Sequence, residues 1–324
     1  MRILITGGGG FIGRQLTQRL LDDGSLALEG HTAETIKRIV VLDNTAVEGL
    51  PDDPRLQVVK GDLCDGELIT ALTAEVDLVW HLAAVVSSAA EADFELGMRV
   101  NIDGLRVLLE ALRSSGRCPR LVYTSGFAVF GGTLPECVRD DTAPTPQSSY
   151  GMQKAVGELL VADYSRRGFI DGRALRLPTI VVRPGKPNKA ASTFVSSIIR
   201  EPLAGKPAVC PVTAETQIYM LSPRQAQAAL CHAMWLDGAT LGDNHIISLP
   251  GITLSVGAMV DTLARVAGEA AAERIEWRFD DEIQRIVESW PTQVEAARAR
   301  TLGFMPDESF EAVVRAHIQD AAAQ

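Results

Sequence analysis

The chain has 324 residues, 46% of them hydrophobic, with a formal net charge of -10 and an isoelectric point of about 5.1. This length can bury a large core and allows two domains, or one domain with an added lobe. The acidic balance argues against a nucleic-acid surface, which needs a basic stripe. The sequence has no run of about 18 apolar residues, so no membrane-spanning helix is expected.

The first thirteen residues predict a dinucleotide-binding turn. Arg2 to Thr6 is a short apolar strand, and Gly7, Gly10 and Gly13 follow at the spacing G-x-x-G-x-x-G. A helical apolar period comes next, at Phe11, Ile12, Leu16 and Leu20. Gly7 would permit a tight turn, Gly10 would admit a pyrophosphate, and Gly13 would let the helix pack closely on the strand. The alternative is an ordinary glycine-rich turn.

A loop over residues 24–37 precedes the second expected strand, Arg38 to Asp43. In a dinucleotide fold, a carboxylate at the end of this strand accepts hydrogen bonds from the adenosine ribose. Asp43 would repel a 2′-phosphate, so the sequence favours NAD over NADP. The alternative is a solvent-exposed loop aspartate.

Two further strands are expected at Leu56 to Lys60 and Val76 to His81. Asp62, directly after the first of them, could accept from the adenine amino group or cap a helix that begins near Cys64. The short segment after the second strand, Leu82-Ala83-Ala84, would leave room for the middle of the cofactor.

One long helix is expected from Glu91 to Ser115, and Asn101 lies inside it, either near the cofactor or bonded to a neighbouring loop. A fifth strand follows at Arg120 to Ser125, and a helix at residues 149–167 has a serine cap. A sixth strand, Ala174 to Val182, is interrupted by Pro178. This alternation predicts an α/β fold of the Rossmann type, a doubly wound parallel sheet with helices on both faces.

Residues 183–324 lack the regular alternation of strands and helices seen before them, because prolines divide this part of the chain into short segments. We expect a smaller C-terminal α/β lobe there for the substrate, after a nucleotide-binding domain at residues 1–182, with room for the chain to return to the sheet. The expected helices are Ser192 to Arg200, Pro223 to Leu236, Ser255 to Ala267, Asp281 to Ser289 and Ser309 to Ala321. The expected strands are Thr216 to Leu221 and His245 to Leu249.

Tyr150 and Lys154 are the reactive candidates, since residues four apart share one helix face. A tyrosine normally titrates near about pH 10 and is a poor base at neutrality. A lysine ammonium beside it would stabilise the phenolate, which could then take a proton from a substrate hydroxyl as hydride leaves.

The combined motifs resemble the extended short-chain dehydrogenases/reductases, the family of NAD-dependent epimerases and dehydratases. The matching motifs are Thr6 to Gly13, Gly61-Asp62-Leu63, His81 to Ala84, Asn101, Val129-Phe130-Gly131 and Tyr150 to Lys154. The stretches SSYGMQKAVGELLVADYSRRGFIDG and RLPTIVVRPGKPNKAASTFVSSIIREPLAG resemble the members that oxidise C2 of a four-carbon sugar acid. The expected cofactor contacts are Gly7, Gly10, Phe11, Ile12, Gly13, Asp43, Asp62, Leu63, Leu82, Ala83, Ala84, Asn101, Tyr150, Lys154 and Pro178.

The sequence departs from the family at one catalytic position. In the family, a catalytic Ser or Thr stands five residues before the glycine of the V-[YF]-G motif. The motif glycine here is Gly131, so that position is occupied by Gly126. Ser125 is the nearest hydroxyl, and it could reach the site if the strand bends at Gly126. Dehydratases place an Asp-Glu pair after the Ser or Thr, whereas Phe127 and Ala128 follow here.

The leading function is therefore NAD-dependent oxidation of a small sugar acid, with Tyr150 as base, Lys154 beside it and Ser125 as the third catalytic residue. Its substrate contacts are expected among Ser87, Ser125, Tyr150, Arg183, Lys186, Asn188 and Arg224. A nucleotide-sugar epimerase with the same tyrosine and lysine, or a non-catalytic NAD-binding regulator, are the alternatives.

Cysteine and histidine usage makes metal and disulfide roles unexpected. The five cysteines lie far apart and form no C-x-x-C motif, which is typical of reduced thiols in the cytoplasm. Two leucine-rich stripes suggest a homodimer, as the family forms one through two helices of each subunit. They are Leu105, Leu108, Leu109 and Leu112, and Val156, Leu159 and Leu160. The alternative is that both stripes pack on the sheet beneath them.

Overall fold

The computed structural model describes residues 1–185 and 191–322, and the chain forms two compact units. The first unit consists of Met1–Val129, Pro146–Arg176 and Gln227–Ile247. The second consists of Phe130–Thr145, Leu177–Ala226 and Ser248–Gln324. Each unit is assembled from three separate segments, and the return of residues 227–247 to the first unit is the kind of crossing back to the sheet that the expected division at residue 182 allowed for.

A seven-stranded sheet forms the centre of the first unit. Its strands, in spatial order, are β13 (Ile246–Ser248), β9 (Asp171–Leu177), β7 (Arg120–Gly126), β6 (Leu78–His81), β1 (Arg2–Thr6), β4 (Arg38–Asp43) and β5 (Leu56–Lys60). The five strands from β7 to β5 pair in parallel. From β5 to β9 the strands appear in the chain as third, second, first, fourth, fifth and sixth, the order of a dinucleotide-binding sheet. This confirms the expected Rossmann-type fold.

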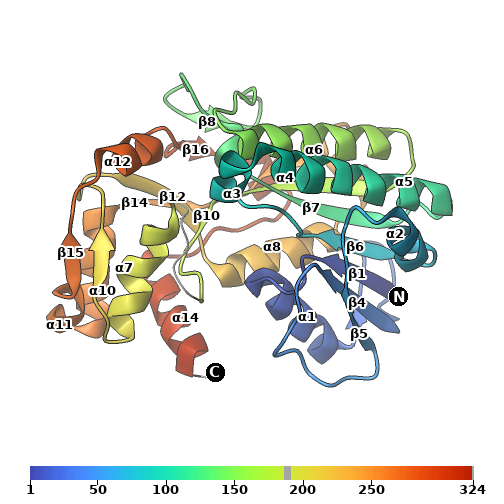
Figure 1. Ribbon diagram of the computed structural model, residues 1–324, viewed down its shortest axis with the longest axis horizontal. Helices are drawn as coiled ribbons and strands as arrows, with labels where there is room; N and C mark the ends of the chain where they lie inside the picture. The colour runs from blue at the N-terminus through green and yellow to red at the C-terminus, as the bar shows by residue number, and fades with distance from the viewer. Residues whose placement is uncertain (186–190, 323–324) are drawn as a thin grey trace. The chain divides into compact units, whose positions relative to one another are not determined.

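The strands are apolar on both sides because helices cover both faces of the sheet. Helices α5 (Leu105–Ser115) and α6 (Ser149–Arg166) lie side by side on one face, and α1 (Phe11–Asp23) and α8 (Pro223–Trp235) lie on the other (Figure 1). Leu4 and Val79 enter the core beneath α5, whereas the indole of Trp80, the next residue on β6, donates to Leu230 O of α8 at 3.1 Å. This alternation follows from the two-residue period of a strand.

The expected long helix at residues 91–115 is wrong, since the structure divides this region into four elements. They are α3 (Ser87–Ala92), α4 (Phe94–Met98), the π-helical turn η1 (Arg99–Gly104) and α5. Asp93 adopts an extended conformation between the first two and caps α4 by accepting from Leu96 N at 2.9 Å. The cap ends one helix and starts the next, so the apolar period alone does not reveal the break.

The structure contains short elements that the sequence did not indicate, and it places the helix expected near Cys64 at α2 (Gly66–Thr73). The expected loop at residues 24–37 contains the two-stranded pair β2 (Ser25–Leu26) and β3 (Glu34–Thr35). Helix α2 follows β5, the 3-10 turn η2 (Phe127–Val129) follows β7, and α9 (Gly238–Leu241) precedes β13. Strands of two residues carry too little pattern to be recognised.

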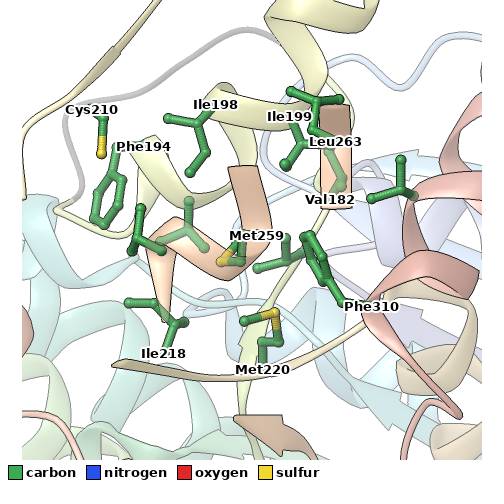
Figure 2. Close-up of a cluster of buried hydrophobic side chains, with 14 of the residues drawn as sticks. Val182, Phe194, Ile198, Ile199, Cys210, Ile218, Met220, Met259, Leu263 and Phe310 are labelled. Atoms are coloured by element: carbon green, nitrogen blue, oxygen red, sulfur yellow. The ribbon is translucent and has the colours of Figure 1, made fainter. Parts of the chain in front are cut away.

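The second unit has its own apolar core between α7 (Thr193–Leu203) and α10 (Val256–Ala267). Figure 2 shows Phe194 and Ile198 of α7 near Met259 of α10, with Ile218 and Met220 of a neighbouring strand below them. Its remaining elements are β8 (Val138–Arg139), β10 (Thr179–Ile180), β11 (Ala208–Cys210), β12 (Gln217–Leu221), β14 (Ile252–Ser255), α11 (Glu269–Ala272), β15 (Ile275–Trp277), α12 (Asp281–Glu288), β16 (Val294–Glu295), α13 (Ala297–Thr301) and α14 (Phe310–Ala322). The five helices expected after residue 183, of which α8 lies mostly in the first unit, are present to within three residues at each end.

The cysteine thiols at all five positions are free. Within residues 1–185 and 191–322, no helix is both long and apolar enough to cross a membrane.

Candidate active site

The glycine turn after β1 is closely packed everywhere except at Gly10. Gly7 has a φ of +69°, and a Cβ there would lie 2.5 Å from Ala83 N. A Cβ on Gly13 would lie 2.5 Å from Gly8 Cα. At Gly10 a Cβ would meet, among the described residues, Gly7 O alone, at 3.3 Å. The turn therefore leaves an open approach at the N-terminus of α1, whose first-turn N–H groups and dipole suit a pyrophosphate.

The Asp43 carboxylate is held beside this turn. Its Oδ2 accepts from Gly9 N at 2.9 Å, while Oδ1 accepts from Thr45 N and Oγ1 at 3.1 and 2.9 Å. The end of β4 thus presents an oriented anion next to the glycines, which is the arrangement that the expected ribose contact requires.

Asp62 has partners on two sides. It accepts from Cys64 N at 2.9 Å and forms an ion pair with Arg99, and these contacts hold the pKa of its carboxyl below the ordinary value. The residue that caps α2 is Asp65, so the alternative in which Asp62 caps this helix is wrong. Leu63 packs its side chain against Gly104, where a Cβ would lie 2.8 Å from it.

Thr6 and His81 join the ends of β1 and β6, where the strand order reverses. Thr6 Oγ1 lies 2.7 Å from His81 Nδ1, and the imidazole stacks on Tyr123 at 5.7 Å. Burial, helped by the charge of Lys154, lowers the pKa of His81 to about 3. His81 is therefore neutral at physiological pH, and its contacts with Thr6 and Tyr123 join three neighbouring strands at the point where the strand order reverses.

Asn101 lies in η1 and binds a loop. Its Oδ1 accepts from Val85 N at 2.8 Å, and its Nδ2 donates to Val85 O and to Gln153 Oε1 at 3.0 and 2.7 Å. Of the two alternatives for Asn101, its side chain adopts the bond to a neighbouring loop. It thereby connects the segment after β6 to α6. π-Helical turns often occur at functional sites.

Helix α6 presents Tyr150 and Lys154 on one face. The helix starts at a cap in which Ser148 Oγ accepts from Gly151 N at 3.1 Å. Lys154 Nζ donates to Thr124 O at 2.7 Å and lies 4.8 Å from the Tyr123 ring centre and 5.6 Å from that of Tyr150. Burial lowers the pKa of Lys154 to about 7, although Glu158 opposes this shift. The ammonium is therefore fixed on the end of β7, facing the phenol.

The hydroxyl of Ser125 is directed into a buried ion pair. It donates to Glu158 Oε1 at 2.5 Å, and the same carboxylate accepts from Arg176 Nε and Nη2 at 2.9 and 2.8 Å. All three residues are buried, with at most 4% of their surface exposed. This arrangement counts against the expected role of Ser125 toward the substrate, because the hydroxyl already has an anionic acceptor.

The other expected contacts fall in different places. Phe11 and Ile12 open α1, Leu82 to Ala84 follow β6, and Ser87 is the first residue of α3. Pro178 lies between β9 and β10, in the second unit. Lys186 and Asn188 lie outside the described residues.

Two arginines were expected to bind the substrate carboxylate, and both lie in the second unit. Arg183 donates through Nη2 to Ser192 Oγ at 3.1 Å, and its carbonyl accepts from Arg200 Nη1 at 2.6 Å. Arg224 forms an exposed ion pair with Asp320 of α14. The substrate contact of Arg224 stays a prediction, and in this structure its guanidinium also bonds to Gln319 of α14.

Sequence reasoning missed the partners that hold the site in place. Glu158 lies one turn beyond Lys154, so its spacing could have shown that it shares the reactive face of α6. Arg176 belongs to another strand, and Thr6 and His81 are far apart in sequence, so their pairings needed the tertiary structure.

Comparisons with known proteins show the family of this chain. The profile of the family described as "NAD dependent epimerase/dehydratase family" matches residues 3–234. A D-erythronate dehydrogenase from Cupriavidus necator is 54% identical over 99% of both chains, and one from Haemophilus influenzae is 43% identical over 98% of this chain and 99% of its own. A crystal structure described as a nucleoside-diphosphate-sugar epimerase, from Agrobacterium tumefaciens, is 43% identical with a TM-score of 0.92, covering 100% of this chain and 95% of the other. The chain thus belongs to the NAD-dependent epimerase/dehydratase family, and its cofactor is NAD.

Proposed function

We propose that this protein oxidises D-erythronate, or a closely related four-carbon sugar acid, at its C2 hydroxyl with NAD. The observation that carries this proposal is the 54% identity to a D-erythronate dehydrogenase over almost the whole chain. The fixed pair of Tyr150 and Lys154 at the end of β7 supports it chemically.

Each reactive side chain has a distinct role in the proposed step. Tyr150, as phenolate, takes the hydroxyl proton while the C2 carbon–hydrogen bond breaks, which leaves a ketone and a neutral phenol. Bound NAD supplies the hydride acceptor for this oxidation. Lys154 stabilises the phenolate and would hold the nicotinamide ribose. Gly10 and the start of α1 would hold the pyrophosphate, and Asp43, which is oriented by Gly9 N, would hold the adenosine ribose.

Epimerisation of a nucleotide sugar is the second candidate, favoured by the description of the Agrobacterium tumefaciens structure. Both reactions would use the same tyrosine and lysine, but an epimerase returns its NAD unchanged. An enzyme that accumulates NADH in proportion to the consumed acid is therefore a dehydrogenase.

The test is a panel of four-carbon and related hydroxy acids with NAD, followed as NADH absorbance and by product analysis. D-Erythronate should give stoichiometric NADH, and nucleotide sugars should give no epimer. Failure of every acid, together with epimer formation, would overturn the proposal.

Tyr150→Phe tests the base. It removes only the proton acceptor, so turnover should fall by about two to four orders of magnitude, the usual range for a positioned base. NAD affinity should stay close to that of the wild type. Tyr164→Phe is a matched control further along α6, because that hydroxyl bonds to Glu110, and it should leave turnover unchanged. Near-normal NADH production by Tyr150→Phe would refute the mechanism.

The assembly that fits this function is a cytoplasmic homodimer formed through α5 and α6. The expected leucine stripe on α5 does not contribute, since Leu105, Leu108, Leu109 and Leu112 are fully buried in the subunit's own core. Leu159 on α6 is 67% exposed and offers an apolar contact for a second copy.

A further inference from the structure

Three buried side chains from three elements meet beneath the reactive face of α6. Glu158 of α6 is 1% exposed. Its carboxylate accepts hydrogen bonds from Ser125 Oγ near the end of β7 and from Nε and Nη2 of Arg176 on β9. A carboxylate with an ionised bidentate partner and a hydroxyl donor is a strong and geometrically specific connection.

The connection continues directly into the proposed catalytic pair. Tyr150, Lys154 and Glu158 follow one another at four-residue spacing, so they lie along one side of α6. Lys154 donates to Thr124 O, the residue next to Ser125. Helix α6 is thus attached to β7 at two adjacent residues, through a lysine and through a carboxylate, and to β9 through Arg176.

We propose that Glu158, held by Arg176 and Ser125, is a positioning residue that fixes Tyr150 and Lys154. These three residues, Glu158, Arg176 and Ser125, form a clamp, and the Ser125 hydroxyl binds Glu158 in this clamp instead of binding the substrate. The inference rests on the proposed dehydrogenase function. The site then works without a side-chain hydroxyl at the position of Gly126, and the substrate oxygen depends on Tyr150.

The surroundings of Lys154 explain why its placement needs a clamp. Its ammonium donates to Thr124 O and lies against the rings of Tyr123 from β7 and Tyr150 from α6. It also interacts electrostatically with the carboxylate of Glu158 and with the imidazole of His81, which is neutral. Glu158 is the anion among them, so its position decides how well the buried positive charge is balanced.

A double-mutant cycle on kcat separates positioning from substrate contact. If Ser125 acts through Glu158, Ser125→Ala should lower kcat by no more than about tenfold, because Arg176 still holds the Glu158 carboxylate through two hydrogen bonds. KM for the acid should be unchanged, and Ser125→Ala should cause no further loss in a Glu158→Gln background. If Ser125 contacts the substrate, its loss should be about 10²- to 10⁴-fold and equal in both backgrounds, which would overturn the inference.

NADH affinity provides a readout that needs no substrate. Glu158→Gln should weaken NADH binding, because Lys154 loses its fixed position, whereas unchanged affinity would contradict the clamp. If Glu158→Gln does not fold, Glu158→Asp replaces it in both experiments, since it keeps the charge but withdraws the carboxylate from Ser125 and Arg176.

Asp171→Asn is the matched control for lost stability. Asp171 begins β9 and pairs with Arg120 at the start of β7 at 2.6 Å, so it links the same two strands at their opposite ends. This variant should lower the melting temperature but leave kcat and NADH affinity unchanged. Failure of the proposed function would appear separately, as a wild-type protein that makes no NADH with any acid, and the NADH-affinity comparison would still test the clamp.

Discussion

Acidification should destabilise this protein through His81, because the folded chain keeps that imidazole neutral. His81 is 1% exposed, bonded to Thr6 and stacked on Tyr123, and its pKa is lowered from the ordinary 6.5 to about 3. The folded-state pKa lies below the unfolded one, so the unfolded chain binds the extra proton between these two values. Stability from this residue is therefore complete above the unfolded pKa and is lost as the pH falls toward the folded pKa.

The size of the effect follows from these two pKa values. Protonation of the unfolded chain alone between about pH 7 and about pH 5 removes about 2 kcal/mol of unfolding free energy. This is a substantial share of the roughly 5–15 kcal/mol that stabilises a typical domain.

Urea unfolding at both pH values measures this loss in the wild type and in His81→Gln, which cannot titrate. The variant should lose about 2 kcal/mol less than the wild type over the same interval. Carboxylates and the buried His317 also titrate, but they are common to both proteins and cancel in the comparison. His31→Gln, at an exposed position, is the control and should behave as the wild type. Equal losses in wild type and His81→Gln would refute the reasoning.

Three further predictions concern the cofactor and assembly. Asp43 should make NAD bind at least about a hundredfold more tightly than NADP, since a carboxylate facing a 2′-phosphate costs several kcal/mol; equal affinities by titration would remove Asp43 from the ribose site. Gly10→Ala should fold with a nearly normal melting temperature but bind NAD more weakly, whereas Gly7→Ala should unfold at lower temperature because of its positive φ and the contact with Ala83 N. Leu159→Glu should weaken the dimer by about tenfold or more, by burying an unpaired charge; a wild type that sedimentation shows to be monomeric at micromolar concentration would contradict the dimer itself.

The sequence by itself determined the first unit's central fold and the proposed reaction partners. Glycine spacing after an apolar strand, an aspartate ending the next strand and a tyrosine four residues before a lysine are local patterns. They are readable because turn, strand and helix geometry fix which side chains share a face. The strands β1, β4 and β5 accordingly begin and end where the sequence indicates.

The tertiary structure decided the features that depend on contacts between distant segments. The π-turn at Asn101 accompanies a bond to the loop after β6, and the break at Asp93 replaces one expected helix by several. The return of residues 227–247 to complete the first unit likewise depends on such contacts. Ser125 is the clearest case. It was expected as a catalytic hydroxyl only if the strand bends at Gly126, whereas in the structure its hydroxyl donates to Glu158, whose carboxylate also accepts from Arg176 of a neighbouring strand. A buried carboxylate requires hydrogen-bond donors, and only the tertiary structure shows which segments supply them.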